Sequence, residues 1–311
     1  MTLDPGLRAL LDQLAQMPVP TPEEDTPAAG RAMYVAMRDA VSGPQPDIGI
    51  LRDVTVEGAA GPLKARIYDT IDAANRPVLM YFHGGGFVIG DLESHDTLCR
   101  QLALDGGFRV IAVDYRLAPE ARFPAAALDC IAATASVARN AAKYGIDPAR
   151  VAVSGDSAGG NLAAVVARDA AINGGPGVAL QLLIYPVTHM GRKGGSRDLF
   201  ADGYFLTRDR MDWFDNHYTG GVDHKDDKLN PLLFDVPKGL APAYIITAGF
   251  DPLRDEGREY ADKLKAAGVA TTYINYESQI HGFFNLPAVS SVGRQAITDA
   301  ANAVARAFKV S

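Results

Sequence analysis

Cysteine is scarce in this chain: 311 residues contain two, Cys99 and Cys130. Both fall within predicted helices, and they do not have the close spacing of metal-binding cysteines. The sequence therefore argues against a disulfide framework and a cysteine-ligated metal, and we expect two buried free thiols. Free thiols suit a reducing compartment, so we expect a cytoplasmic protein.

Long apolar runs and clustered positive charge are also missing. No run approaches the roughly 18 apolar residues that cross a bilayer, and residues 1–5 lack the basic start and apolar core of a secretion signal. The net charge is −7, and the lysines and arginines are scattered. No phosphate-loop pattern occurs. We therefore expect no membrane span, no nucleic-acid partner, no metal and no cofactor.

What the chain does have, from about residue 50 onward, is an alternation of short apolar segments and helical segments. Helices are predicted at 124–145, 158–172 and 256–267 and from about 291. Strands are predicted at 54–56, 65–68, 77–82, 109–113, 151–155, 178–185, 243–248 and 270–276. This pattern is typical of an α/β fold with a mostly parallel central sheet flanked by helices on both faces.

Ser157 lies in Gly155-Asp156-Ser157-Ala158-Gly159, directly after a predicted strand and directly before a predicted helix. A serine hydroxyl is a poor nucleophile unless a sharp strand-to-helix turn holds it away from the backbone. Flanking glycines permit that turn, because a Cβ at either position would collide with the neighbouring strand or helix. The context therefore favours a nucleophile over an ordinary turn.

A nucleophilic serine requires a base and an acid that orients the base. In α/β hydrolases these residues follow in the order Ser, Asp or Glu, His, each after a strand. Asp251 and His281 follow predicted strands in that order. Both are expected at the carboxyl ends of the strands, where open α/β sheets bind ligands.

Each candidate has rivals. Asp255 is a second acid near Asp251, but it precedes the helical run from Glu256, and we interpret it as an N-cap. The alternative bases are His189, His217 and His224, none of which follows a predicted sheet strand.

His83-Gly84-Gly85-Gly86 follows a buried strand and supplies backbone donors. Consecutive glycines let N–H groups approach a tetrahedral intermediate with no side chain in the way. The amide of Ala158, at the start of a helix, is expected to be a further donor.

Taken together, these motifs resemble those of the hormone-sensitive lipase family of carboxylesterases, which have an α/β-hydrolase fold. The shared segments cover about residues 50–310 and are 83–86, 114–120, 155–160, 251–257 and 281–283. The resemblance implies that Ser157 is the nucleophile, Asp251 the acid and His281 the base.

The resemblance further implies an oxyanion hole formed by Gly85, Gly86 and Ala158. His83, Gly84 and Asp156 are expected to support it. Tyr115 and Glu120 are likewise expected to be supportive rather than catalytic, because 114–120 resembles a loop that braces the glycine turn.

Two segments interrupt the alternation and match the family's helical cap. Residues 1–47 are predicted to form its N-terminal part, with helices at Pro5–Met17 and Glu23–Ser42 separated by Pro18, Pro20 and Pro22. Residues 186–235 form an insertion between core parts at 48–185 and 236–311. Its middle, residues 200–218, contains six aromatic residues: Phe200, Tyr204, Phe205, Trp213, Phe214 and Tyr218. Two interpretations stay open: a small subdomain that buries these rings in its own core, or a lid whose rings line an acyl pocket.

The expected function is hydrolysis of small esters with short to medium acyl chains through an acyl-enzyme. One alternative is an amide or carbamate hydrolase similar to arylacetamide deacetylase, and another is a non-catalytic ligand-binding receptor of the same fold. The segment 270–276 is rich in β-formers and is predicted to be an edge strand, which leads to the hypothesis of a homodimer paired through it.

Overall fold

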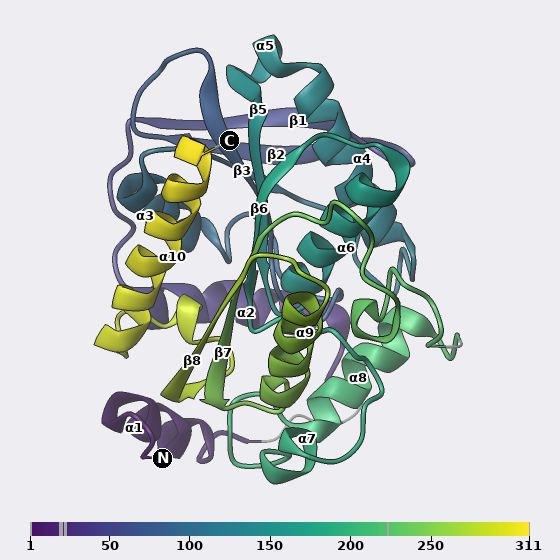
Figure 1. Ribbon diagram of the computed structural model, residues 1–311. Coiled ribbons are helices and arrows are strands. Elements are labelled where there is room, and N and C mark those ends of the chain that lie inside the picture. The colour runs from purple at the N-terminus through teal and green to yellow at the C-terminus, as the bar shows by residue number, and fades with distance from the viewer. Residues whose placement is uncertain (1, 19–20, 22–23, 223, 311) are drawn as a thin grey trace.

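The computed structural model describes residues 2–18, 21, 24–222 and 224–310. The strands of this part form one sheet in the order β1-β2-β4-β3-β5-β6-β7-β8 (Figure 1). Strands β3 to β8 run parallel, whereas β2 pairs antiparallel with both β1 and β4. Their bounds are β1 Ile50–Gly58, β2 Gly61–Asp69, β3 Arg76–Phe82, β4 Arg109–Val113, β5 Ile146–Asp156, β6 Val178–Ile184, β7 Ala243–Phe250 and β8 Thr271–Ile280. The predicted α/β fold with a mostly parallel sheet is confirmed.

Helices cover both faces of the sheet (Figure 1). One face carries α3 (Asp96–Gly106) and α10 (Ser291–Val310), and the other carries α4 (Ala125–Arg139), α6 (Ala158–Asn173) and α9 (Arg254–Ala266). The single helix predicted at 124–145 is in fact two, α4 and α5 (Ala141–Tyr144). The break is at Asn140, whose backbone N–H makes the last bond of α4 to the carbonyl of Ser136 and whose side-chain amide donates to the same oxygen, a side-chain bond that competes with continuation of the helix.

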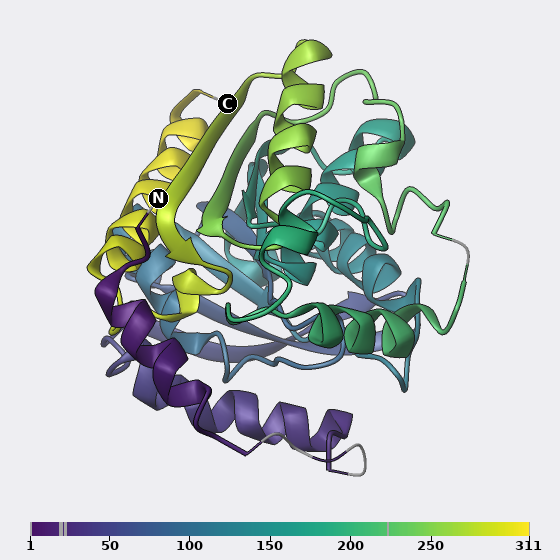
Figure 2. The same ribbon diagram turned by 90° about the horizontal axis from the view of Figure 1, so that it is seen from below.

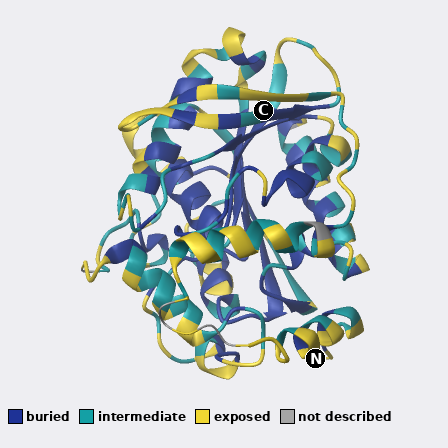
Figure 3. Cartoon of the chain, turned by 180° about the vertical axis from the view of Figure 1, so that it is seen from behind, coloured by how far each residue is buried: buried dark blue, intermediate teal, exposed yellow. Residues whose placement is uncertain are grey.

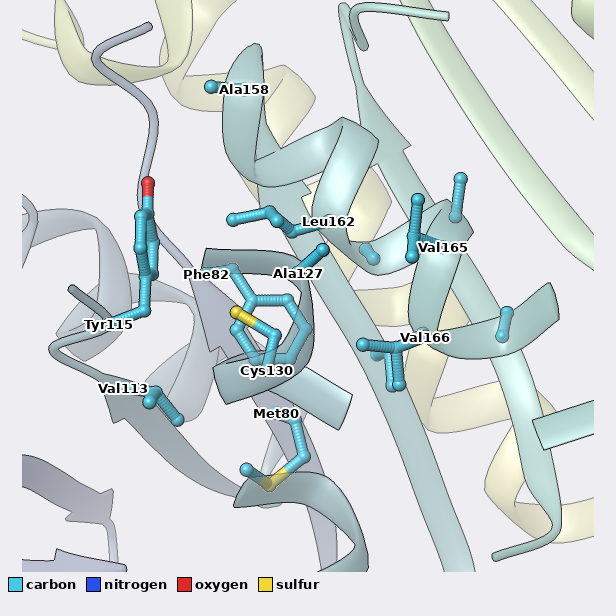
Figure 4. Close-up of a cluster of buried hydrophobic side chains, with 14 of the residues drawn as sticks. Met80, Phe82, Val113, Tyr115, Ala127, Cys130, Ala158, Leu162, Val165 and Val166 are labelled. Atoms are coloured by element: carbon cyan, nitrogen blue, oxygen red, sulfur yellow. The ribbon is translucent and has the colours of Figure 1, made fainter. Parts of the chain in front are cut away.

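The core lies between the sheet and its helices, where the central strands are buried along almost their whole length (Figure 3). In Figure 4, Met80 and Phe82 of β3 and Val113 of β4 pack against Cys130 of α4 and Leu162 of α6. Cys99 packs in the cluster on the other face of the sheet. Both cysteines are buried and free, as predicted. No helix of the described chain combines the length and apolarity needed to span a membrane.

Two stretches lie outside the sheet and the helices that flank it: the N-terminal segment (residues 1–47) and the inserted segment (186–235) (Figures 1 and 2). The former contains α1 (Pro5–Leu14) and α2 (Pro27–Ser42), and the latter α7 (Ser196–Leu199), α8 (Arg208–Thr219) and the 3-10 turn η1 (Pro231–Leu233). The predicted helix start at Glu23 and two of the three prolines, Pro20 and Pro22, lie outside the described residues. Helix α2 begins at Pro27, after Thr26, whose hydroxyl accepts from the backbone N–H of Ala29.

The two segments share one apolar cluster. Leu7 and Leu11 of α1 pack with Phe200 of the inserted segment and with Phe250 at the end of β7. Trp213 of α8 donates through its indole N–H to the backbone oxygen of Asp25 at 3.2 Å. Segments that are far apart in the chain are thus joined at the end of the sheet where β5, β7 and β8 finish.

Candidate active site

Ser157 occupies a sharp turn between β5 and α6. Its backbone is in the left-handed region at φ 56° and ψ −116°, a strained conformation for a residue with a Cβ. The neighbouring glycines leave no room for a side chain: a Cβ on Gly159 would overlap the backbone oxygen of Phe82, and one on Gly155 would overlap the backbone of Gly159. The close approach predicted from the sequence is confirmed.

Asp251, His281 and Ser157 form a hydrogen-bonded line at the carboxyl ends of β7, β8 and β5. The Nε2 of His281 is 2.9 Å from the Oγ of Ser157, and its Nδ1 is 2.8 Å from the Oδ2 of Asp251. The Asp251 carboxylate is fully buried, and its Oδ1 accepts the backbone N–H of Leu253 at 2.8 Å. The structure therefore brings together three side chains that are 30 and 94 residues apart in the chain.

The rival residues lie elsewhere and have other partners. Asp255 accepts the backbone N–H of Ser196 at 2.8 Å and pairs with Arg254. It is the second residue of α9 rather than its N-cap, so our interpretation of its role was wrong: the N-cap position is Leu253, which makes no side-chain cap. The three rival histidines, His189, His217 and His224, all belong to the inserted segment and contact residues other than Ser157. The backbone of His189 bonds to Glu256 and Arg197, the ring of His217 to the Trp213 carbonyl, and the ring of His224 to Asp215.

The backbone amides of Gly85, Gly86 and Ala158 donate to no protein acceptor within the described residues. Gly85 and Gly86 have φ values of 116° and 59°, both in the region that favours glycine. Ala158 is the first residue of α6, where the unpaired N–H groups and the helix dipole favour an anion. Gly85, Gly86 and Ser157 line the same cavity.

Asp156, the residue before Ser157, is buried and accepts hydrogen bonds from the glycine turn and the sheet. It is 2% exposed, and its Oδ1 accepts the hydroxyl of Tyr81 at 2.6 Å and the backbone N–H of Gly84 at 2.9 Å. Burial alone would raise the pKa of Asp156, but the interaction with the His95 ring and these hydrogen bonds outweigh it and lower the pKa to about 2. The carboxylate therefore remains ionised and holds the glycine turn against the serine turn.

His83 supports the glycine turn from its other side. Its ring stacks on Tyr115 with centroids 4.3 Å apart, and the Tyr115 hydroxyl donates to the His83 carbonyl at 2.6 Å. Burial and the nearby His95 lower the pKa of His83 to about 4, so the ring is neutral near pH 7. Glu120 plays a different part from Tyr115: it lies at the surface and pairs with Arg31 of α2 at 2.8 Å.

Ser157 and His281 open into a cavity of about 750 Å³. Met33 and Met37 of α2 line it from the N-terminal segment, and Phe205 and Phe214 line it from the inserted segment. The Phe214 ring lies against Gly86, where any Cβ would overlap it.

Two of the six aromatic residues line the cavity, as the lid interpretation expects, but the other interpretation is wrong for the three rings that pack on residues outside the inserted segment rather than in a core of its own. Phe205 and Phe214 line the cavity. Phe200 and Tyr204 instead pack on Phe250 of the core, and Tyr218 stacks on Phe87.

Sequence reasoning missed two residues that contact this machinery. Tyr185, the residue after β6, places its buried ring 4.7 Å from that of His281 and has a φ of 35°, unusual for a residue with a Cβ. Its position after a strand at the same sheet edge was a signal that could have found it. Asn285 donates to Asp156 at 3.2 Å, and no motif marks it. In the described part of the chain, no group of three or more His, Cys, Asp or Glu residues is placed to hold a metal ion.

Comparison with known proteins points in one direction. The model of the α/β-hydrolase fold family matches residues 79–285. Carboxylic ester hydrolase LipN of Mycobacterium tuberculosis is 44% identical over 92% of this chain and 78% of its own length. Carboxylesterase NlhH of the same organism is 38% identical over 98% of this chain and 96% of its own. The structure of ester-hydrolase EH1AB1 from the metagenome of Lake Arreo, complexed with a derivative of bipyridine phosphonate, superposes with a TM-score of 0.94 at 43% identity over 99% of this chain and 100% of that one.

Proposed function

This chain belongs to the α/β-hydrolase family and, within it, to the carboxylic ester hydrolases of the hormone-sensitive lipase group; from that premise we propose that Ser157, His281 and Asp251 are its catalytic triad. Gly85, Gly86 and Ala158 form the oxyanion hole in this proposal, and Asp156, His83 and Gly84 support it. The observation that carries the proposal is the hydrogen-bonded line from Asp251 through His281 to Ser157, with both distances below 3 Å.

The line accounts for the first chemical step. His281 Nδ1 donates to the buried carboxylate of Asp251, which leaves Nε2 free to accept the proton of the Ser157 hydroxyl as Oγ attacks the ester carbonyl. The positive charge that forms on the imidazole is stabilised by Asp251 without moving the proton to the carboxylate. The negative charge that forms on the carbonyl oxygen is stabilised by the three unpaired amides.

Collapse of that intermediate breaks the bond to the alcohol, which leaves with the proton from Nε2. The acyl group then remains on Ser157 Oγ. Water attacks the acyl carbon while His281 takes one of its protons, and the second tetrahedral intermediate collapses to the free acid as His281 returns that proton to the Oγ of Ser157. The net reaction consumes one ester and one water and yields one acid and one alcohol, with no change of oxidation state.

We propose that the substrates have short to medium acyl chains, because the N-terminal and inserted segments act together as a cap that closes one side of the cavity. Their shared contacts are the apolar cluster of α1 with Phe200 and the hydrogen bond from Trp213 to Asp25. Phe214 narrows the cavity at the oxyanion turn, and Phe205 contacts the position next to the base at Gly282. An acyl-length series that peaks at long chains contradicts this proposal.

Covalent labelling tests the nucleophile. A p-nitrophenyl alkylphosphonate should add one phosphonyl group per chain, found on the peptide that contains Ser157 by mass spectrometry, and should abolish ester hydrolysis. The variant Ser157→Ala is the matched control and should remain unlabelled. An unlabelled wild-type chain with no esterase activity is the outcome expected of a ligand-binding receptor, and faster hydrolysis of an anilide than of the matching ester points to an amidase.

Two proposals concern the whole molecule. Strand β8 is the last strand of the sheet, and the backbone N–H of Asp4 donates to it at Ser278, beyond residues 271–276, so we propose that residues 271–276 pair with a second copy in a homodimer. A monomer mass by light scattering overturns this. We also propose a cytoplasmic location, supported by the two free, buried thiols; recovery of the native protein from outside the cell contradicts it.

A further inference from the structure

Asn285 ends the 3-10 turn η2 (Phe283–Asn285), four residues after His281. The turn is tight: Gly282 is left-handed at φ 82°, and the backbone N–H of Asn285 donates to its carbonyl at 2.9 Å. A shift of Asn285 is therefore transmitted through few bonds to the imidazole.

The side chain of Asn285 reaches across to the serine turn. Its Nδ2 is 3.2 Å from the Oδ2 of Asp156, the residue before Ser157. Because an ionised carboxylate only accepts hydrogen bonds, the amide nitrogen must face it and the orientation of the asparagine is defined. The other oxygen of Asp156 already accepts from Tyr81 and Gly84.

Two connections therefore join the turn that carries His281 to the turn that carries Ser157. One is the reacting pair itself, at 2.9 Å. The other is the bond from Asn285 to Asp156. Phe283 and Phe284 also anchor the turn, and both are fully buried, but apolar burial is not directional and does not set the position of an imidazole edge to a fraction of an ångström.

We propose that Asn285 is a positioning residue for catalysis: its bond to Asp156 sets the separation of His281 from Ser157 and couples both to the glycine turn at Gly84. The proposal rests on the proposed triad. The Asp156 carboxylate is then the common acceptor for the three catalytic segments, and Asn285 is the donor from the segment of the base.

The test exchanges the two partners. Asn285→Asp removes the donor and sets two carboxylates against each other, and Asp156→Asn removes the acceptor. In the double variant the hydrogen bond is restored in reverse, because the new amide at 156 keeps an oxygen for Tyr81 and Gly84 and presents its NH₂ to the new carboxylate at 285. Asn285→Ala removes the donor without adding charge.

The single variants should lower kcat for a p-nitrophenyl ester by about tenfold to a hundredfold, the effect of displacing reacting groups by up to ~1 Å, with KM within about twofold. The double variant should recover most of the kcat. Asn173→Asp is the matched control: Asn173 donates to Asp169 at 2.7 Å on the surface, so the same kind of exchange there should leave kcat unchanged.

Three results overturn the proposal: unchanged kcat in Asn285→Ala, a raised KM with unchanged kcat, or folded single variants with low kcat that the double variant does not rescue. Thermal unfolding of each variant identifies the folded ones, and if Asn285→Asp does not fold, Asn285→Ala decides the question by the first two results. Failure of the triad itself is a separate outcome, seen as a wild-type chain that the phosphonate does not label at Ser157.

Discussion

Replacing Asp251 by asparagine tests the triad through the hydrogen-bond requirements of two neighbours. Asp251 now satisfies both, with Oδ1 on the Leu253 N–H and Oδ2 on His281 Nδ1. Asparagine keeps one oxygen. The Leu253 N–H is buried and requires an acceptor, so that oxygen turns to Leu253 and the new NH₂ group faces Nδ1. His281 must then carry its proton on Nε2, where it cannot accept the serine proton.

The expected cost follows from this wrong tautomer. The equivalent change in serine proteases lowers kcat by about 10⁴, which is about 5.5 kcal/mol of activation free energy, and we expect the same order for Asp251→Asn. The measurement is kcat for p-nitrophenyl butyrate near neutral pH, with Tm to show that the variant is folded. Because asparagine fills the same space, substrate binding should be little changed.

Asp255→Asn is the matched control, since Asp255 is close in sequence and its hydrogen-bond partners are Ser196 and Arg254 rather than His281. Its kcat should stay within about twofold of the wild type. Near-full activity in Asp251→Asn, together with a large loss in Asp255→Asn, would transfer the acid role to Asp255 and refute the geometry described above.

Three further predictions follow from other contacts. Phe214→Ala removes the ring that lies against Gly86 in the cavity wall. The ratio of kcat/KM for the p-nitrophenyl decanoate over the butyrate ester should therefore rise by about tenfold to a hundredfold, the range for a changed fit in an apolar pocket. An unchanged ratio in an acyl-length series contradicts a role of the ring in limiting chain length. Arg31 donates to two backbone oxygens as well as to Glu120. Urea unfolding should therefore show that Arg31→Gln lowers the free energy of unfolding by about 1.5–3 kcal/mol, whereas Glu120→Gln, at an exposed site, lowers it by less than about 1 kcal/mol. Equal losses in the two variants contradict this. The pKa of His83 in the folded protein, about 4, lies below its ordinary value of 6.5, so between these pH values the unfolded state binds more protons than the folded state. The neutral ring therefore stabilises the folded protein fully above pH 6.5, and this stabilisation is lost as the pH falls toward 4. Urea unfolding at pH 7 and pH 5 should show a loss of about 2 kcal/mol that is absent in His83→Asn, and an equal loss in both proteins would show that another group is responsible.

The parts of the fold that the sequence predicted are those where local chemistry determines the backbone. Gly155 and Gly159 have no room for a Cβ, and the apolar segments before Ser157 and Asp251 are strands buried inside the sheet. Each of these signals is contained within about ten residues. The order of the three side chains along the chain then placed them at one edge of a parallel sheet.

Element ends were predicted less well because they depend on contacts outside the element. Strand β8 continues to Ile280, four residues beyond its predicted end, because Ile280 pairs with Phe250 past an irregularity in β7. Asp255 was misinterpreted for a similar reason. An acidic residue at a helix start usually caps that helix, but here the Asp255 carboxylate accepts the backbone N–H of Ser196 in the inserted segment instead. The roles of the six aromatic residues were undecided because nothing in their spacing shows which elements they contact.

Asn285 shows why positioning residues escape a reading of motifs. A nucleophile turn requires particular residues at fixed neighbours in the chain, whereas Asn285 has only to present one N–H to a carboxylate 129 residues away. Several side chains have such a donor, so neither its identity nor its spacing forms a pattern. The Asp156 carboxylate, by contrast, is constrained by Tyr81, Gly84 and Asn285 and by the buried ring of His95, whose Nε2 is 3.4 Å from Oδ2. For this reason changes at 156 should be harder to compensate than changes at 285, and the exchanged double variant is a stricter test of the bond than either single one.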